Sequence, residues 1–114
     1  MARKRPVDAT SINLYFGRDI RKKGRVSDDN WQKFQVKVIA RALRGEGYSF
    51  MAGKGVYVYP DGSQVSEDSF FLEIVSTNRT VALAAAEVIA DEYKRRFKQA
   101  SVLIVWQNVK MIFR

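Results

Sequence analysis

The feature that most constrains the fold is the alternation of two kinds of segment along the chain. Strand-like segments, in which apolar and polar residues alternate, are separated by segments with apolar residues at helical spacing. In the first strand, for example, Ile12, Leu14 and Phe16 fall on one side. The predicted strands are 11–16, 48–59, 64–76 and 102–113, and the predicted helices run from Ser27 to the glycines at 45 and 47 and from Thr80 to Gln99.

The first helix has a clear start. Ser27 can cap its free amide groups, and Asp28 and Asp29 suit the positive end of the helix dipole. In both helices the apolar residues form one stripe, which favours burial against a sheet over a role in binding. The stripes comprise Trp31, Phe34, Val38, Ile39 and Ala42 in the first helix and Ala82, Ala86, Ile89, Tyr93 and Phe97 in the second.

The second and third strands are joined by a tight turn. Residues 60–63 read Pro-Asp-Gly-Ser, a combination that favours chain reversal and predicts a β-hairpin. Within the second strand, Gly53 and Gly55 predict a bulge or bend. They lack the spacing of a phosphate-binding loop, so no nucleotide site is predicted there.

The element order strand-helix-strand-strand-helix-strand predicts an α+β fold of the ferredoxin-like type. Two right-handed crossovers give a four-stranded antiparallel sheet in the order 4-1-3-2, with both helices on one face. We expect residues 1–10 to form a basic tail and residues 11–114 to form this single domain. The final strand is apolar at both parities, which predicts that both of its faces are covered.

The sheet face without helices is the main candidate site. Phe70, Leu72 and Ile74 are assigned to the core, so their neighbours of opposite parity face outward. An aromatic patch seldom faces water unless something binds it. We therefore expect a homodimer of the dimeric α+β barrel type or a small apolar ligand. The predicted ligand or dimer face comprises Tyr15, Tyr57, Tyr59, Phe71, Glu73 and Val75, with Asn13 and Ser69 beside them.

Glu73 has two interpretations. In a sheet-lined pocket it could be the general acid or base of a small-molecule enzyme, with a hydrogen bond from Tyr15, Tyr57 or Lys54. A lone carboxylate without a partner motif favours a role at an interface. The chain has no histidine and no cysteine, which removes the commonest zinc ligands and nucleophiles. We therefore predict no catalytic residues, no metal site and no cofactor.

The net charge of +8 suggests an alternative function. Residues 1–25 hold eight basic and two acidic residues. The predicted topology brings the cations of residues 18–25 near the end of the second helix, where they could bind nucleic acid non-specifically or an acidic protein. Solvation of a charged face is the simpler interpretation. The candidate phosphate-binding residues are Arg18, Arg21, Lys22, Lys23, Arg25, Lys94, Arg95, Arg96 and Lys98.

Two further patterns concern RNA and localisation. Residues 14–17, Leu-Tyr-Phe-Gly, are similar to the first-strand motif of RNA-recognition domains, but Glu67 and Asp68 stand where that family has a basic residue and glycine. This argues against sequence-specific RNA binding. The basic N-terminus lacks the apolar run of a secretory signal, and no segment is long enough to span a bilayer. We expect a cytoplasmic protein that does not insert into membranes.

Several short stretches together resemble a small bacterial family of domains of unknown function with a ferredoxin-like fold. The resemblance covers about residues 12 to 105 and implies the fold, but it implies no reaction and no catalytic residues. The stretches are Leu14-Tyr15-Phe16-Gly17, Val26-Ser27 with Trp31 and Phe34, Gly55 with the Asp-Gly turn, Glu67 before Ser69, and Tyr93 followed by Phe97-Lys98-Gln99-Ala100-Ser101-Val102.

Overall fold

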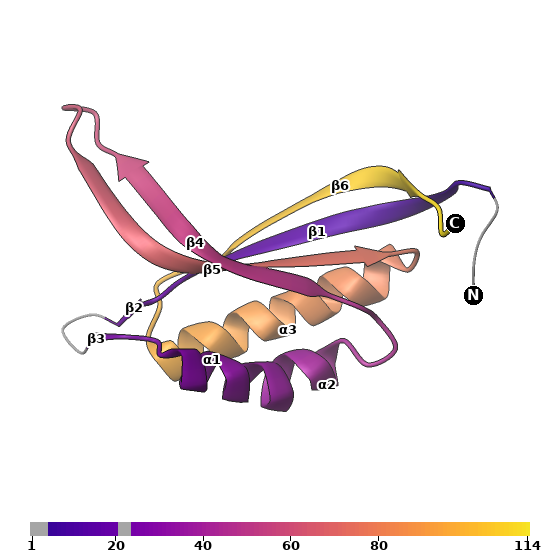
Figure 1. Ribbon diagram of the computed structural model, residues 1–114, viewed down its shortest axis with the longest axis horizontal. Helices are drawn as coiled ribbons and strands as arrows, with labels where there is room; N and C mark the ends of the chain where they lie inside the picture. The colour runs from indigo at the N-terminus through magenta and orange to yellow at the C-terminus, as the bar shows by residue number, and fades with distance from the viewer. Residues whose placement is uncertain (1–4, 21–23) are drawn as a thin grey trace.

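The computed structural model describes residues 5–20 and 24–114. They form a four-stranded antiparallel sheet with the helices on one face, which confirms the predicted ferredoxin-like α+β fold (Figure 1). The long strands are β1 (Val7–Gly17), β4 (Ser49–Val58), β5 (Gln64–Ser76) and β6 (Leu103–Met111). The helical segments are α1 (Asp28–Phe34), η1 (Gln35–Ile39), α2 (Ala40–Ala42) and α3 (Arg79–Phe97), and β2 (Asp19–Ile20) pairs with β3 (Gly24–Arg25) in a small ribbon.

The sheet order is β4-β5-β1-β6, as predicted from right-handed crossovers. The first strand begins at Val7 rather than Ser11, because residues 7–10 pair with β6 in continuous register from Val7↔Met111 onward. Part of the segment expected to be a basic tail therefore lies in the sheet. The predicted helices lie side by side beneath it (Figure 1). None of the described helices is long and apolar enough to cross a membrane.

The segments α1, η1 and α2 form one continuous helix. This helix is capped as expected, since the Ser27 Oγ accepts a hydrogen bond from the backbone N–H of Asn30 at 3.0 Å. Its middle turn, η1, is π-helical and passes directly into α2. The chain then leaves the helix through Gly45, whose φ of +87° suits glycine. The helix α3 ends at Phe97, and its C-cap residue, Lys98, adopts a left-handed conformation with φ 53°.

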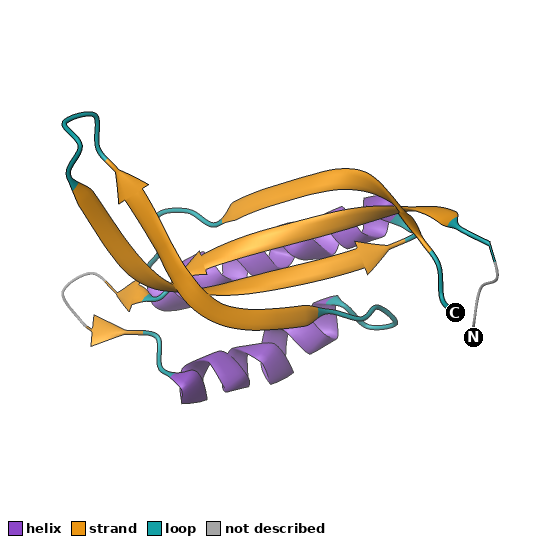
Figure 2. Cartoon of the chain, turned by 45° about the horizontal axis from the view of Figure 1, so that its top comes forward, coloured by secondary structure: helices purple, strands orange, loops and turns teal. Residues whose placement is uncertain are grey.

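The core lies between the helices and one face of the sheet. Trp31 stacks on Phe70 with ring centroids 4.1 Å apart, and Phe16 and Tyr93 pack closely beside them. Phe70, Leu72 and Ile74 are all buried, as their parity predicts. Because the helices cover only this face, the opposite face of the sheet is left open (Figure 2).

The hairpin of β4 and β5 extends beyond the helices, and we call residues 56–65 the hairpin arm (Figures 1 and 2). Its residues are exposed. No bulge interrupts the ladder at Gly53 and Gly55, which pair with Ser69 and Glu67 in unbroken register. The two strands curve instead (Figure 2).

Candidate functional site

One row of apolar side chains crosses all four strands on the open face. Cross-strand pairing places Met51 opposite Phe71, Phe71 opposite Tyr15, and Tyr15 opposite Leu103. The Tyr15 and Phe71 rings meet edge to face with centroids 5.5 Å apart, a favourable geometry. Leu103, at one end of the row, is 60% exposed. We call these four residues the apolar row.

A more polar row lies beside the apolar row. It consists of Ser49, Glu73, Asn13 and Val105, which are paired across the same four strands. Glu73 is exposed and borders a shallow hollow of about 200 Å³ that Phe71 also lines. The open face therefore combines an apolar surface with a carboxylate and an amide that can hydrogen bond to a bound molecule.

The predicted face is split between two places. Tyr15, Phe71, Glu73 and Val75 lie on the open face, where Val75 is paired with Ser11. Tyr57 and Tyr59 lie on the hairpin arm, where their rings contact each other with centroids 4.9 Å apart. The extra length and curvature of β4 and β5 separate these tyrosines from the rest.

Lys54 is not a hydrogen-bond donor to Glu73. Its Nζ donates to Oδ1 of Asp68 at 2.8 Å, on the opposite side of the strand. This hydrogen bond is the main reason that the pKa of Asp68 is below its ordinary value, so Asp68 stays ionised. Arg25 also pairs with the Asp68 carboxylate.

Glycines allow two side chains to lie across the sheet at the base of the hairpin arm. A Cβ atom on Gly53 would lie 2.6 Å from Cε2 of Phe71, and one on Gly17 would lie 2.6 Å from Oε2 of Glu67. That same oxygen accepts a hydrogen bond from the backbone N–H of Asp19 at 3.0 Å. The glycine in β4 thus makes room for the central ring of the apolar row.

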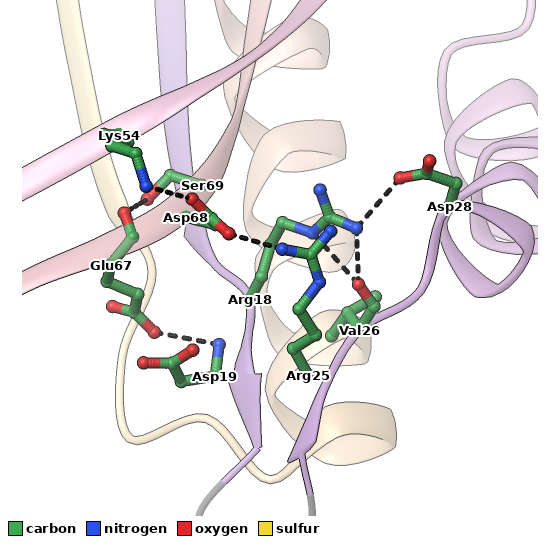
Figure 3. A network of polar contacts seen from close by, with 9 residues as sticks. All are labelled: Arg18, Asp19, Arg25, Val26, Asp28, Lys54, Glu67, Asp68 and Ser69. Atoms are coloured by element: carbon green, nitrogen blue, oxygen red, sulfur yellow. Dashed lines mark hydrogen bonds and ion pairs between the residues drawn. The ribbon is translucent and has the colours of Figure 1, made fainter.

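Arg18, one of the predicted phosphate-binding residues, is a structural residue (Figure 3). It is only 4% exposed, and its Nε and Nη2 donate to the Val26 carbonyl at 2.9 and 2.8 Å. Nη2 also donates to Oδ1 of Asp28 at 2.9 Å, and the guanidinium lies 4.2 Å from the centroid of the Phe70 ring. These contacts satisfy the side chain within the protein and leave it unavailable to a phosphate.

The end of α3 lies beside the end of β1, as the topology predicts. Gln99 Nε2 donates to the Asp19 carbonyl at 2.6 Å, and the Tyr93 hydroxyl donates to the Gly17 carbonyl at 2.7 Å. Burial raises the pKa of Tyr93, so its hydroxyl keeps the proton that it donates.

The candidate phosphate-binding residues that the structure describes cluster where α3 ends beside β1, which we call the basic end. Several of these cations are already paired with carboxylates. Glu92 accepts hydrogen bonds from Arg95 at 2.8 Å and Arg96 at 3.2 Å. With Arg18 and Arg25, four of the candidate cations thus have carboxylate partners. Lys94 and Lys98 lie at the end of α3, whereas Arg21, Lys22 and Lys23 lie outside the described residues. Binding of nucleic acid or an acidic protein by this end stays a prediction.

Three further residues of the open face, Met51, Leu103 and Val105, were not predicted from the sequence. Their parity relative to Tyr15 and Phe71 was the available signal, but it depends on knowing the register of the edge strands. On the helix side of β6, Trp106 is still 47% exposed, because α3 packs mainly on β1 and β5. Within one chain, neither face of the final strand is fully covered.

Metal binding has no support in the described part of the chain. Residues 5–20 and 24–114 contain no group of three or more acidic, histidine or cysteine side chains arranged to hold an ion.

Solved structures of other proteins share this fold. A phage SAM lyase in complex with S-methyl-5'-thioadenosine superposes with a TM-score of 0.64 and 20% identity, covering 91% of this chain and 89% of that one. CutA from Archaeoglobus fulgidus, a periplasmic divalent cation tolerance protein, has a TM-score of 0.54 and 11% identity, over 87% and 81% of the chains. At these identities the likeness establishes the fold alone.

No functionally curated protein matches the chain in sequence. The model of one family does match, over residues 11–113, and that family is described as a protein of unknown function (DUF3574). This range includes β1 from residue 11 onward, all of β4, β5 and β6, and all of the helical segments. The chain therefore belongs to the DUF3574 family, in agreement with the expected membership of a family of unknown function.

Proposed function

We propose that this protein is a non-enzymatic binding protein that works as a homodimer, in which a second copy covers the open sheet face. The observation that carries this proposal is the apolar row, which runs without interruption from one edge of the sheet to the other. Each Å² of apolar surface removed from water contributes roughly 25 cal/mol. A row of four large side chains therefore gives a substantial driving force for association.

The arrangement of the row suits a two-fold dimer. Tyr15 and Phe71 lie on the two central strands, β1 and β5, and Leu103 and Met51 flank them on the edge strands. A two-fold axis through the centre of the row would place like surfaces together, as an isologous interface requires. The small or polar neighbours Ser49, Asn13 and Ser11 leave the row as the most prominent part of the face.

The hairpin arm supports the same proposal. Apolar residues occur on both of its faces, and an isolated two-stranded hairpin has little stability in water. Contact with a second copy would cover these side chains and stabilise the arm. The exposed apolar residues of the arm are Val56, Tyr57, Val58, Tyr59 and Val65.

A small ligand can be accommodated in this dimer. The hollow beside Glu73 and Phe71 is open to solvent in one chain, and a facing copy would close it. The carboxylate of Glu73 would then favour a ligand with an apolar body and a hydrogen-bond donor. We therefore extend the proposal to a small, largely apolar ligand at the dimer face.

The test is the molar mass in solution, measured by light scattering over a range of protein concentrations. We expect twice the chain mass for the native protein and the mass of a single chain for Leu103→Glu, which places a charge on the open face. Val88→Glu is the matched control, because Val88 is similarly exposed but lies on α3. A monomeric native protein, or equal effects of the two variants, would refute the homodimer.

A further inference from the structure

A groove lies on the helix side of the sheet, away from the open face. It has a volume of about 560 Å³ and runs between β4 and the continuous helix formed by α1, η1 and α2. Gln32, Gln35 and Val36 line it from the helical side, and Tyr48 and Phe50 line it from β4 and the residue before that strand. Small-molecule sites typically have volumes of roughly 300–1,000 Å³, so this groove has room for one small molecule.

The groove has aromatic walls. Trp31 and Phe70 line it as a stacked pair with an interplanar angle of 11°. Phe50 lies with its ring centroid 6.1 Å from that of Trp31, yet it is 51% exposed. A flat aromatic molecule placed here would cover Phe50 and contact rings that are already fixed by packing.

The Trp31 side chain carries an unpartnered donor. Its Nε1 is the only buried side-chain nitrogen or oxygen in residues 5–20 and 24–114 that lacks a hydrogen-bond partner. Leaving such a group unsatisfied costs about 1–3 kcal/mol, and most buried polar groups in proteins are paired. A ligand that supplies an acceptor would recover this cost.

The backbone beside the groove is also unusual. The wall that includes Gln35 and Val36 belongs to η1, and π-helical turns within α-helices frequently occur at functional sites. Gln35 Oε1 accepts a hydrogen bond from the Tyr48 hydroxyl at 3.3 Å, which is a long contact. Burial raises the pKa of Tyr48, so this hydroxyl is protonated and can donate to a ligand.

From these contacts we infer that the groove binds a flat, uncharged heteroaromatic molecule whose ring nitrogen or carbonyl accepts a hydrogen bond from Trp31 Nε1. An uncharged ligand fits this lining, because every lining side chain except Asp28 is uncharged and Asp28 is paired with Arg18. Because Nε1 is buried, binding requires a neighbouring side chain to move before an acceptor can reach it, and we assign this movement to the half-exposed Phe50. The groove shares only Phe50 with the hollow beside Glu73 and lies on the helix side of the sheet, so the inference goes beyond the proposed dimer.

The test compares benzimidazole with indole, which have the same shape but differ in one ring-nitrogen acceptor. Titrations are followed by the ¹H–¹⁵N resonances of the two tryptophan indoles near neutral pH. We expect benzimidazole to shift the Trp31 resonance in a saturable manner while that of Trp106, on β6, stays in place. One added neutral hydrogen bond corresponds to about tenfold tighter binding than for indole.

Two variants of exposed alanines test whether the shift arises in the groove, one inside the groove and one as its matched control. Ala40→Phe places a ring in the groove and should abolish the shift, whereas Ala84→Phe makes the same change on the exposed side of α3 and should leave it intact. Neither alanine is buried, so both variants should fold. Leu103→Glu should also leave the shift intact, which separates this inference from the dimer.

Three outcomes would overturn the inference. The first is that neither compound moves the Trp31 resonance, and the second is that indole binds as tightly as benzimidazole. The third is that Ala40→Phe lowers the molar mass of the native assembly, because the groove would then be occupied by a second copy of the chain.

Discussion

The two faces of the sheet are built from alternate residues of the same strands, yet they have opposite environments. In β5, Phe70 and Leu72 point toward the helices and are almost completely buried, whereas Phe71 and Val75 lie on the open face and contact water. The residue types on the two faces are similar. Hydrophobicity alone therefore does not decide burial within one chain. Coverage by the helices decides it, and the face without helices keeps an apolar surface that a partner can use.

The largest expected effect tests this difference directly. Leu72→Ala should reduce the free energy of unfolding by about 2–5 kcal/mol, because it removes packed atoms and leaves a cavity. Leu103→Ala, on the open face, should change it by about 0.5 kcal/mol or less at protein concentrations where the chain is monomeric. Urea unfolding followed by circular dichroism measures both. Equal losses in the two variants would contradict the contrast between the faces.

A second comparison concerns two arginines of the predicted basic end. Arg18→Ala removes two hydrogen bonds to the Val26 carbonyl and should cost about 1–3 kcal/mol of stability. Arg25→Ala removes an ion pair between partly exposed groups and should cost about 1 kcal/mol or less. Thermal and urea unfolding give the comparison. If Arg18→Ala left stability unchanged, its assignment as a structural residue would be wrong.

The close approach of Phe71 to the backbone of β4 gives a smaller effect. Gly53→Ala should destabilise the protein by about 1 kcal/mol, because the new Cβ overlaps the Phe71 ring and forces it to move. The control is Gly47→Ala, where nothing lies within 4 Å of the added atom. NMR shifts of the Tyr15 ring should change in the first variant only. Unchanged Tyr15 shifts in Gly53→Ala would refute this packing.

The smallest effect is a dependence of stability on pH at Asp68. The hydrogen bond from Lys54 lowers the pKa of Asp68 in the folded protein below its ordinary value of 3.8, so the ionised carboxylate stabilises the fold. This contribution is fully present above pH 3.8 and is lost as the pH falls through the folded-state pKa. Asp68→Asn should therefore flatten the acid limb of a stability–pH curve. A curve identical to that of the native protein would show that the pair contributes nothing.

Much of the fold can be predicted from local patterns. The helix cap at Ser27, the turn at residues 60–63 and the parity of β5 all follow from residue types and spacing, because each depends on neighbours in sequence. The strand order follows from chirality. The π-helical turn of η1 could not be predicted, because Gln35–Ile39 have no distinctive pattern and their conformation depends on packing.

The candidate site could be predicted only in part. Tyr15, Phe71, Glu73 and Val75 were placed correctly on one face, since alternation along a strand determines that side. The separation of Tyr57 and Tyr59 from that face was missed, because the length and curvature of the hairpin arm depend on pairing between β4 and β5.

The α+β class, the order of the strands and the residues that face the helices all follow from the sequence, because periodicity and handedness are local properties of an L-amino-acid chain. Two other features depend on how the folded chain packs. The tertiary structure joins Met51, Phe71, Tyr15 and Leu103 into one row and pairs Arg18 with Asp28. These groups come from distant parts of the chain, and only the register of the strands and the packing of the helices bring them together.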